Sequence, residues 1–161
     1  DLDAAEVSLG LASSILASSG PVPPFHASAY HRSQLVFDVA RLARAVEAGS
    51  ARDRRRAKRR ALRSARTARR SAAKVAWHRP EVLRLTARVY ELLGNDRRAL
   101  RLLDRAVRAA EQMGAQPEIA RAYAVVAPIV ARGRPNLRFF GNDAEQCRAR
   151  ARNGFDTFGL A

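Results

Sequence analysis

Apolar residues recur every three or four positions over most of the chain, which is the spacing of one face of an α-helix. This pattern predicts a first helix over residues 3–18 and a second over residues 32–48, each followed by a glycine that can end it. Prolines interrupt the pattern between the two helices. We therefore expect residues 25–31 to form an ordered loop whose Phe25 and Tyr30 enter the core.

A different helical pattern follows over residues 51–76, where alanine occupies the apolar positions and arginine most of the others. A narrow alanine stripe lets a neighbouring helix approach closely, although it buries little area per residue. So many like charges at i,i+4 spacing weaken an isolated helix, and we expect tertiary packing or a polyanion to hold it in place. The stripe consists of Ala57, Ala61, Ala65, Ala68 and Ala72.

Four more helices are indicated after His78. The fourth covers residues 80–93, because proline suits the first turn of a helix, and the fifth follows the Gly94-Asn95-Asp96 turn and runs to Met113. The sixth contains Pro128, which we expect to kink it. A long loop over residues 133–142 then leads to a closing helix, whose inward positions are predicted to be Ala144, Cys147, Ala151, Phe155 and Phe158.

An internal repeat links the fourth and sixth helices. The stretch that starts with Pro80 and Glu81 begins again at Pro117, 37 residues later, with an aliphatic residue, an arginine and an alanine at matching positions. Helix pairs of this length cannot bury their apolar faces alone, so repeated pairs stack on one another. The repeat therefore predicts stacked helical hairpins.

With Pro80 as position 1, positions 4, 8, 11, 15, 20, 24 and 27 resemble the signature of tetratricopeptide repeats, and the match is closest over residues 78–127. Thr86 and Glu111 depart from it, since leucine and proline are usual there. The sequence that follows resembles the C-terminal helical-repeat regions of large bacterial signalling proteins, in which a signal-transduction ATPase is joined to a cyclase, a Ser/Thr kinase or a transcription regulator. The signature residues are Leu83, Ala87, Tyr90, Gly94, Ala99, Leu103 and Ala106.

This resemblance implies an all-α fold, an antiparallel helix-pair solenoid of about seven helices. Residues 1–49 would form an N-terminal helix pair with a proline-rich connection. Residues 50–161 would form the repeats with a C-terminal capping helix, as one continuous solenoid. The implied function is a non-catalytic scaffold in a larger signalling protein, which binds a protein, an acidic peptide or another domain of its parent chain.

In this superfamily the first helix of each repeat lines a concave groove. The corresponding residues here would include Arg84, Arg88 and Arg121, a basic strip for an acidic peptide. The alternative is that neighbouring glutamates at i,i+3 spacing simply neutralise these arginines in solvent. The groove positions are Glu81, Arg84, Arg88, Glu91 and Leu92 in the first copy and Glu118, Arg121, Val125 and Pro128 in the second.

The charge balance suggests a second function. The chain has 30 Lys and Arg against 15 Asp and Glu, a formal charge of +15, and such a field attracts polyanions. Only Lys58 and Lys74 are lysines, so codon bias in a GC-rich genome is a competing explanation for the arginines. The alternative function is therefore nucleic-acid binding, although the sequence shows no zinc-finger or helix-turn-helix pattern. The residues that would contact the nucleic acid are Arg52, Arg55, Arg56, Arg59, Arg60, Arg63, Arg66 and Arg70.

We find no sequence motif that is typical of a catalytic, metal or cofactor site. The sequence contains neither a glycine-rich phosphate loop nor a Gly-x-Ser-x-Gly elbow, and we expect no enzymatic activity. His26 and His31 lack the acidic support of a zinc site, so we expect no metal and no cofactor. We expect His78 to cap or pack a helix, and Trp77 to lie in the core.

The remaining signals concern location. The lone Cys147 excludes an internal disulfide and suits a reducing cytoplasm. Residues 7–17 are apolar, but this segment is short and follows acidic residues, so we expect neither a signal peptide nor a transmembrane helix. Because the sequence begins at Asp1, we expect a piece of a longer cytoplasmic protein.

Overall fold

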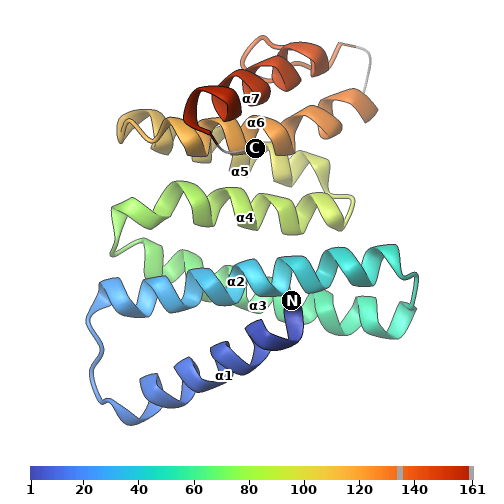
Figure 1. Cartoon of the computed structure of the whole chain (residues 1–161). Helices are drawn as coiled ribbons and strands as arrows, with labels where there is room; N and C mark the ends of the chain where they lie inside the picture. The colour runs from blue at the N-terminus through green and yellow to red at the C-terminus, as the bar shows by residue number, and fades with distance from the viewer. Residues whose placement is uncertain (134–135, 160–161) are drawn as a thin grey trace.

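A computed structural model describes residues 1–133 and 136–159, which form seven α-helices and one 3₁₀ turn, η1, and no β-strand (Figure 1). The predicted all-α fold is therefore confirmed. The elements are α1 (Leu2–Ser18), α2 (Pro24–Glu47), α3 (Ala51–Ala72), η1 (Ala76–His78), α4 (Arg79–Leu92), α5 (Asp96–Gln112), α6 (Gln116–Arg132) and α7 (Ala144–Phe158).

Short polar side chains define where several helices begin. The Asp53 backbone N–H donates to the Ser50 hydroxyl at the start of α3, at 3.3 Å, and the Arg98 N–H donates to the Asn95 side chain at the start of α5, at 3.1 Å. At α7, Asp143 and Gln146 exchange hydrogen bonds in a capping box. Each cap satisfies a backbone donor that has no partner within its own helix.

The segment between α1 and α2 differs from the prediction. Residues 25–31 are helical and not a loop, because Pro24 stands in the first turn of α2, where a missing N–H costs no hydrogen bond. Phe25 does not enter the core, since 54% of it is exposed, and Tyr30 is half-buried. Helix α3 is shorter than expected, because it ends at Ala72.

Helix α4 belongs to two hydrophobic cores. Its Val82, Leu85 and Val89 pack into a core made with α2 and α3, which includes the predicted alanine stripe of α3. Its Leu83 and Ala87 pack into a second core made with α5, α6 and α7. Two apolar faces on one helix thus connect the two halves of the molecule.

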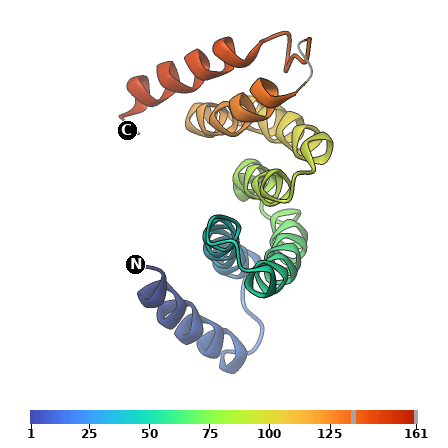
Figure 2. The same ribbon diagram turned by 90° about the vertical axis from the view of Figure 1, so that its right-hand side faces the viewer.

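The helices form consecutive pairs, α2 with α3, α4 with α5 and α6 with α7. The first members, α2, α4 and α6, also contact their neighbours in the row, whereas α3 and α5 do not contact each other. The pairs follow a curve with both termini on its inner side, where α2, α4 and α6 also lie (Figure 2). Paired helices occur in many all-α folds, so the tetratricopeptide assignment stays a prediction.

The C-terminal part is closed by α7, which packs on α6. Cys147 and Ala151 are buried as predicted and Phe155 is half-buried, but Phe158 is exposed. A methyl group on Gly154 would lie 2.4 Å from the Ala120 Cβ, so the two helices approach too closely there for a larger residue.

The loop before α7 is only partly described, because Arg134 and Pro135 of the predicted 133–142 segment lie outside the described residues, as do residues 160–161. Phe139 is buried and meets the Tyr123 ring edge-on, with 5.7 Å between centroids. Pro128 lies on the exposed side of α6, which continues beyond it to Arg132. This loop therefore contributes an aromatic side chain to the second core.

The N-terminal helix is attached differently from the others. α1 contains no buried residue and, among the helices described, packs against α2, with one further contact to α3 through the Glu6–Arg60 ion pair. Its outer face exposes Val7, Leu11 and Ile15. No helix within the described residues combines the length and the apolar character needed to cross a membrane.

Candidate partner-binding surfaces

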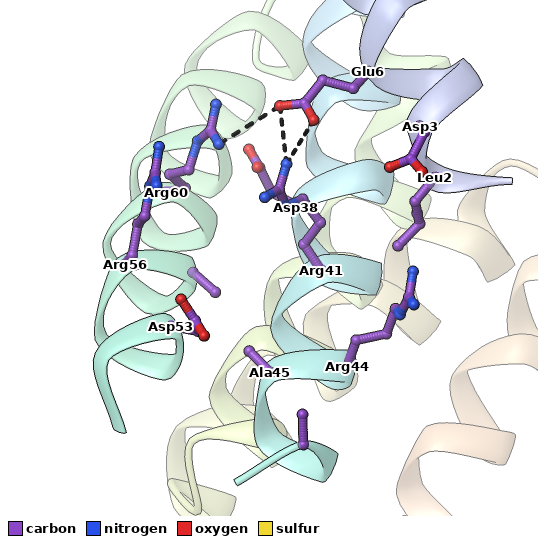
Figure 3. A pocket seen from close by; sticks show the side chains of 12 residues that line it. Leu2, Asp3, Glu6, Asp38, Arg41, Arg44, Ala45, Asp53, Arg56 and Arg60 are labelled. Carbon is purple, nitrogen blue, oxygen red and sulfur yellow. Dashed lines mark hydrogen bonds and ion pairs between the residues drawn. The ribbon is translucent and has the colours of Figure 1, made fainter. Parts of the chain in front are cut away.

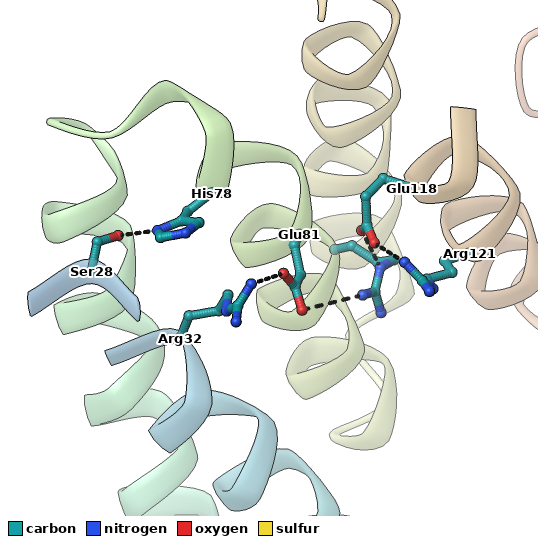
Figure 4. Close-up of polar contacts among 7 residues, drawn as sticks. Ser28, Arg32, His78, Glu81, Glu118 and Arg121 are labelled. Carbon is teal, nitrogen blue, oxygen red and sulfur yellow. Dashed lines mark hydrogen bonds and ion pairs between the residues drawn. The ribbon is translucent and has the colours of Figure 1, made fainter. Parts of the chain in front are cut away.

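A chain of ion pairs crosses the inner helices α2, α4 and α6 (Figure 4). Arg32 of α2 donates to Glu81 of α4 at 3.1 Å, and Arg84 lies 4.0 Å from the other oxygen of Glu81. The Arg84 Nε donates to Glu118 of α6 at 2.9 Å, and Arg121 donates to the second Glu118 oxygen at 2.7 Å. Four of the groove positions predicted from the repeat, Glu81, Arg84, Glu118 and Arg121, are thus neighbours in space.

The central ion pair of this series, between Arg84 and Glu118, is largely shielded from water and helps to hold α4 and α6 together. The side chains of Arg84 and Glu118 are 14% and 15% exposed, and charges removed from water in this way need a partner. Burial would raise the pKa of Glu118, but Arg84 and Arg121 together hold it below its ordinary value. An acidic peptide that engaged Arg84 would therefore compete with Glu118 for the guanidinium group.

The remaining groove positions form a second cluster and part of the core. Arg88 donates to Glu91. Arg132 forms two further ion pairs, one with Glu91 at 3.1 Å and one with Asp96 at 2.7 Å. Hydrogen bonding to Asp96 raises the pKa of Arg132, a residue that the repeat pattern did not select. Leu92 and Val125 pack against the two cores and Pro128 is exposed.

The exposed Trp77 lines one cavity with several members of this series of ion pairs. It is 71% exposed, so the prediction that it lies in the core is wrong. Its neighbour His78 points inward instead, where its Nδ1 and the Ser28 hydroxyl are 2.9 Å apart and burial lowers its pKa. The 3₁₀ turn between α3 and α4 thus turns one ring out and the other in.

Trp77 borders a cavity of about 370 Å³. Three predicted groove residues, Glu81, Glu118 and Arg121, line the same cavity, together with Arg32. It therefore combines an apolar wall with charged groups that are already paired. The apolar residues that line it are Trp77, Pro80, Met113, Ala115 and Pro117.

The arginine-rich helix α3 presents a second surface, on the opposite side from its alanine stripe. All eight predicted polyanion-binding arginines are exposed, and within residues 1–133 and 136–159 only Arg60 forms an ion pair, at 3.8 Å from Glu6. Seven of them occupy a sector of about 100° at 3.6 residues per turn, which we call the arginine face. It consists of Arg52, Arg55, Arg56, Arg59, Arg63, Arg66 and Arg70.

Along one edge of α3, acidic and basic side chains occur in equal number. A cavity of about 300 Å³ between α1, α2 and α3 is lined by four carboxylates and four guanidinium groups, and Glu6 accepts from Arg41 through both oxygens at 2.9 Å (Figure 3). Nearby carboxylates therefore offset part of the charge at this edge. The charged lining residues are Asp3, Glu6, Asp38 and Asp53 with Arg41, Arg44, Arg56 and Arg60.

Metal ligands do not converge in the part of the chain that is described, where no three His, Cys, Asp or Glu side chains are grouped to hold an ion. No family model, no curated protein and no solved structure matches this chain. Its function is therefore inferred from its surfaces.

Proposed function

We propose that this chain is a non-catalytic protein-interaction module of tetratricopeptide-like helix pairs, belonging to a larger signalling protein, and that its partner binds at the cavity beside Trp77. The observation that carries the proposal is the 71% exposure of the chain's single tryptophan. Tryptophan is enriched among the few interface residues that supply most of the binding energy.

The surroundings of Trp77 suit a protein interface. Phe25 is also exposed and lies on the inward-turned His78, with 5.3 Å between ring centroids. The charged residues at the cavity satisfy one another, and a polar rim of this kind orients a partner more than it adds affinity. An apolar anchor of the partner, buried against Trp77, is therefore the main source of affinity.

Replacing Trp77 with alanine is expected to weaken partner capture by at least about tenfold, since loss of an interface hot spot costs about 2 kcal/mol or more. The full chain would be used to capture proteins from lysate of the cells that encode it, and each captured protein quantified. The matched control is Val36→Ala, which removes an exposed apolar side chain of α2 that does not line this cavity.

Retention of the same proteins by Trp77→Ala and by the wild-type chain would contradict the proposal. With a purified partner, Trp77 fluorescence offers a second readout, because burial of this single indole shifts its emission to shorter wavelength. Absence of that shift at saturating partner would place the contact elsewhere.

The arginine face favours a second function, polyanion binding. Seven exposed arginines on one sector, without ion pairs among the described residues, create a field that phosphate groups neutralise. The wild-type chain is expected to bind a random 20-base-pair duplex with an affinity that falls steeply as salt rises, measured by fluorescence anisotropy. If the arginines reflect codon usage alone, no salt-dependent binding near micromolar concentration will be found.

A further inference from the structure

A third cavity, of about 570 Å³, is lined by residues of α3, α4 and α5. Among the described residues its lining includes five arginines and no acidic residue, in contrast to the balanced cavity of Figure 3. Its apolar lining residues are Ala72 and Ala73 at the end of α3 and Val82 and Leu83 in α4. The arginines are Arg66, Arg69 and Arg70 of α3, Arg79 of α4 and Arg105 of α5.

We propose that this arginine cavity holds backbone phosphates of a nucleic acid that lies along the arginine face. The inference rests on the polyanion-binding function proposed above. It extends the contact surface from α3 to Arg79 and Arg105, which lie on two further helices.

The state of the five guanidinium groups supports an anionic ligand. Within residues 1–133 and 136–159, none of them forms an ion pair, and all except the half-buried Arg69 are exposed. Like charges gathered around one cavity repel each other, and an anion between them removes that repulsion. The planar guanidinium group forms paired hydrogen bonds with phosphate oxygens, which makes arginine the preferred residue for such sites.

The cavity is continuous with the arginine face, because Arg66 and Arg70 belong to both. The 22 residues of α3 span about 33 Å, close to one turn of duplex DNA at about 34 Å. A nucleic acid along α3 would therefore bring phosphates to the cavity while it contacts the rest of the face. This match in length favours a regular phosphate chain over an isolated anion.

The surface gives less support to a membrane. Binding to anionic lipid in the interface needs large apolar side chains beside the basic ones. Among the described residues, the exposed large apolar side chains lie outside α3, α4 and α5. They are Val7, Leu11, Ile15, Phe25, Val36, Trp77, Phe140 and Phe158.

The test compares two double variants of the full chain that lose equal charge. Arg79→Gln with Arg105→Gln removes two guanidinium groups from the cavity, and Arg97→Gln with Arg101→Gln removes two exposed groups of α5 that do not line it. Binding of a 20-base-pair duplex is measured over a salt series. Thermal unfolding of all the proteins checks that the helices are intact.

We expect the cavity variant to bind more weakly than the wild type at every salt concentration, with the slope of log affinity against log salt reduced by about 1 to 2. The α5 control should keep its slope within about 0.5 of the wild-type value, since it loses no phosphate contact. This pair of results would support a phosphate site in the arginine cavity.

Other results would overturn the inference in distinguishable ways. No duplex binding by the wild type refutes the polyanion function and the cavity site together. Wild-type binding that both variants weaken equally leaves the function standing and refutes the cavity site. Wild-type binding of polyglutamate or of phosphatidylglycerol vesicles, with the same sensitivity to Arg79 and Arg105 and with no duplex binding, assigns the site to an acidic protein or a membrane and refutes nucleic acid.

Discussion

Replacement of Leu103 with alanine is expected to lower the free energy of unfolding by about 2–5 kcal/mol. Leu103 is fully buried in the second core, on the face of α5 that meets α4 and α6. Truncation there removes apolar contacts and leaves a cavity that the surrounding helices fill only in part. Urea denaturation followed by the helical circular dichroism signal measures the change.

The matched control for this experiment is Leu11→Ala. Leu11 has the same side chain in a helix, but it is 63% exposed on the outer face of α1. Its truncation should change the free energy of unfolding by no more than about 0.5 kcal/mol. Equal effects of the two substitutions would show that α5 does not pack as described.

Replacement of Arg84 with alanine is expected to cost about 1–3 kcal/mol at neutral pH, because it leaves the partly buried Glu118 carboxylate with fewer donors. Arg121 still donates to Glu118, which keeps the loss below that of a fully unpaired buried charge. The control is Arg148→Ala, which breaks an exposed ion pair with Glu145 within α7 and should leave the free energy of unfolding almost unchanged. Chemical denaturation of both variants gives the comparison.

The same contact predicts a pH dependence. The pKa of Glu118 is lower in the folded chain than in the unfolded one, so its contribution to stability is complete above the ordinary glutamate pKa and is lost as pH falls through the folded value. Wild-type stability should therefore decrease in acid, and Arg84→Ala should lose less over the same range. A variant with an unchanged acid profile would show that Arg84 does not set this pKa.

The sequence alone located most helices because local signals mark their ends. Asn95 caps α5, and the glycines that follow α1 and α2 have positive φ angles, a conformation that suits glycine. The signal failed at Phe25, where three prolines were read as breaking a helix although one of them begins it. It failed again at Trp77, since the short turn after α3 decides which of two adjacent rings faces the core.

The candidate sites were less accessible to sequence reasoning. The repeat brought Arg84 and Glu118 into one group, but their direct contact joins residues 34 positions apart and depends on how α4 and α6 pack. Arg32 and Arg132 lie outside the repeat positions that were considered. The arginine cavity could not be found from the pattern, because only the packing of α4 against both α3 and α5 brings Arg79 and Arg105 to the same cavity as the arginines of α3.

The position of α4 in both cores has a consequence for how the molecule comes apart. Opening of either core would expose one apolar face of α4 to water, so the two halves are expected to unfold cooperatively. Helix α1 contributes no buried side chain and can detach at low free-energy cost. Amide hydrogen exchange would then be fast in α1 and slowest in α4. A ligand in the arginine cavity, which α4 lines, would slow exchange in both halves at once.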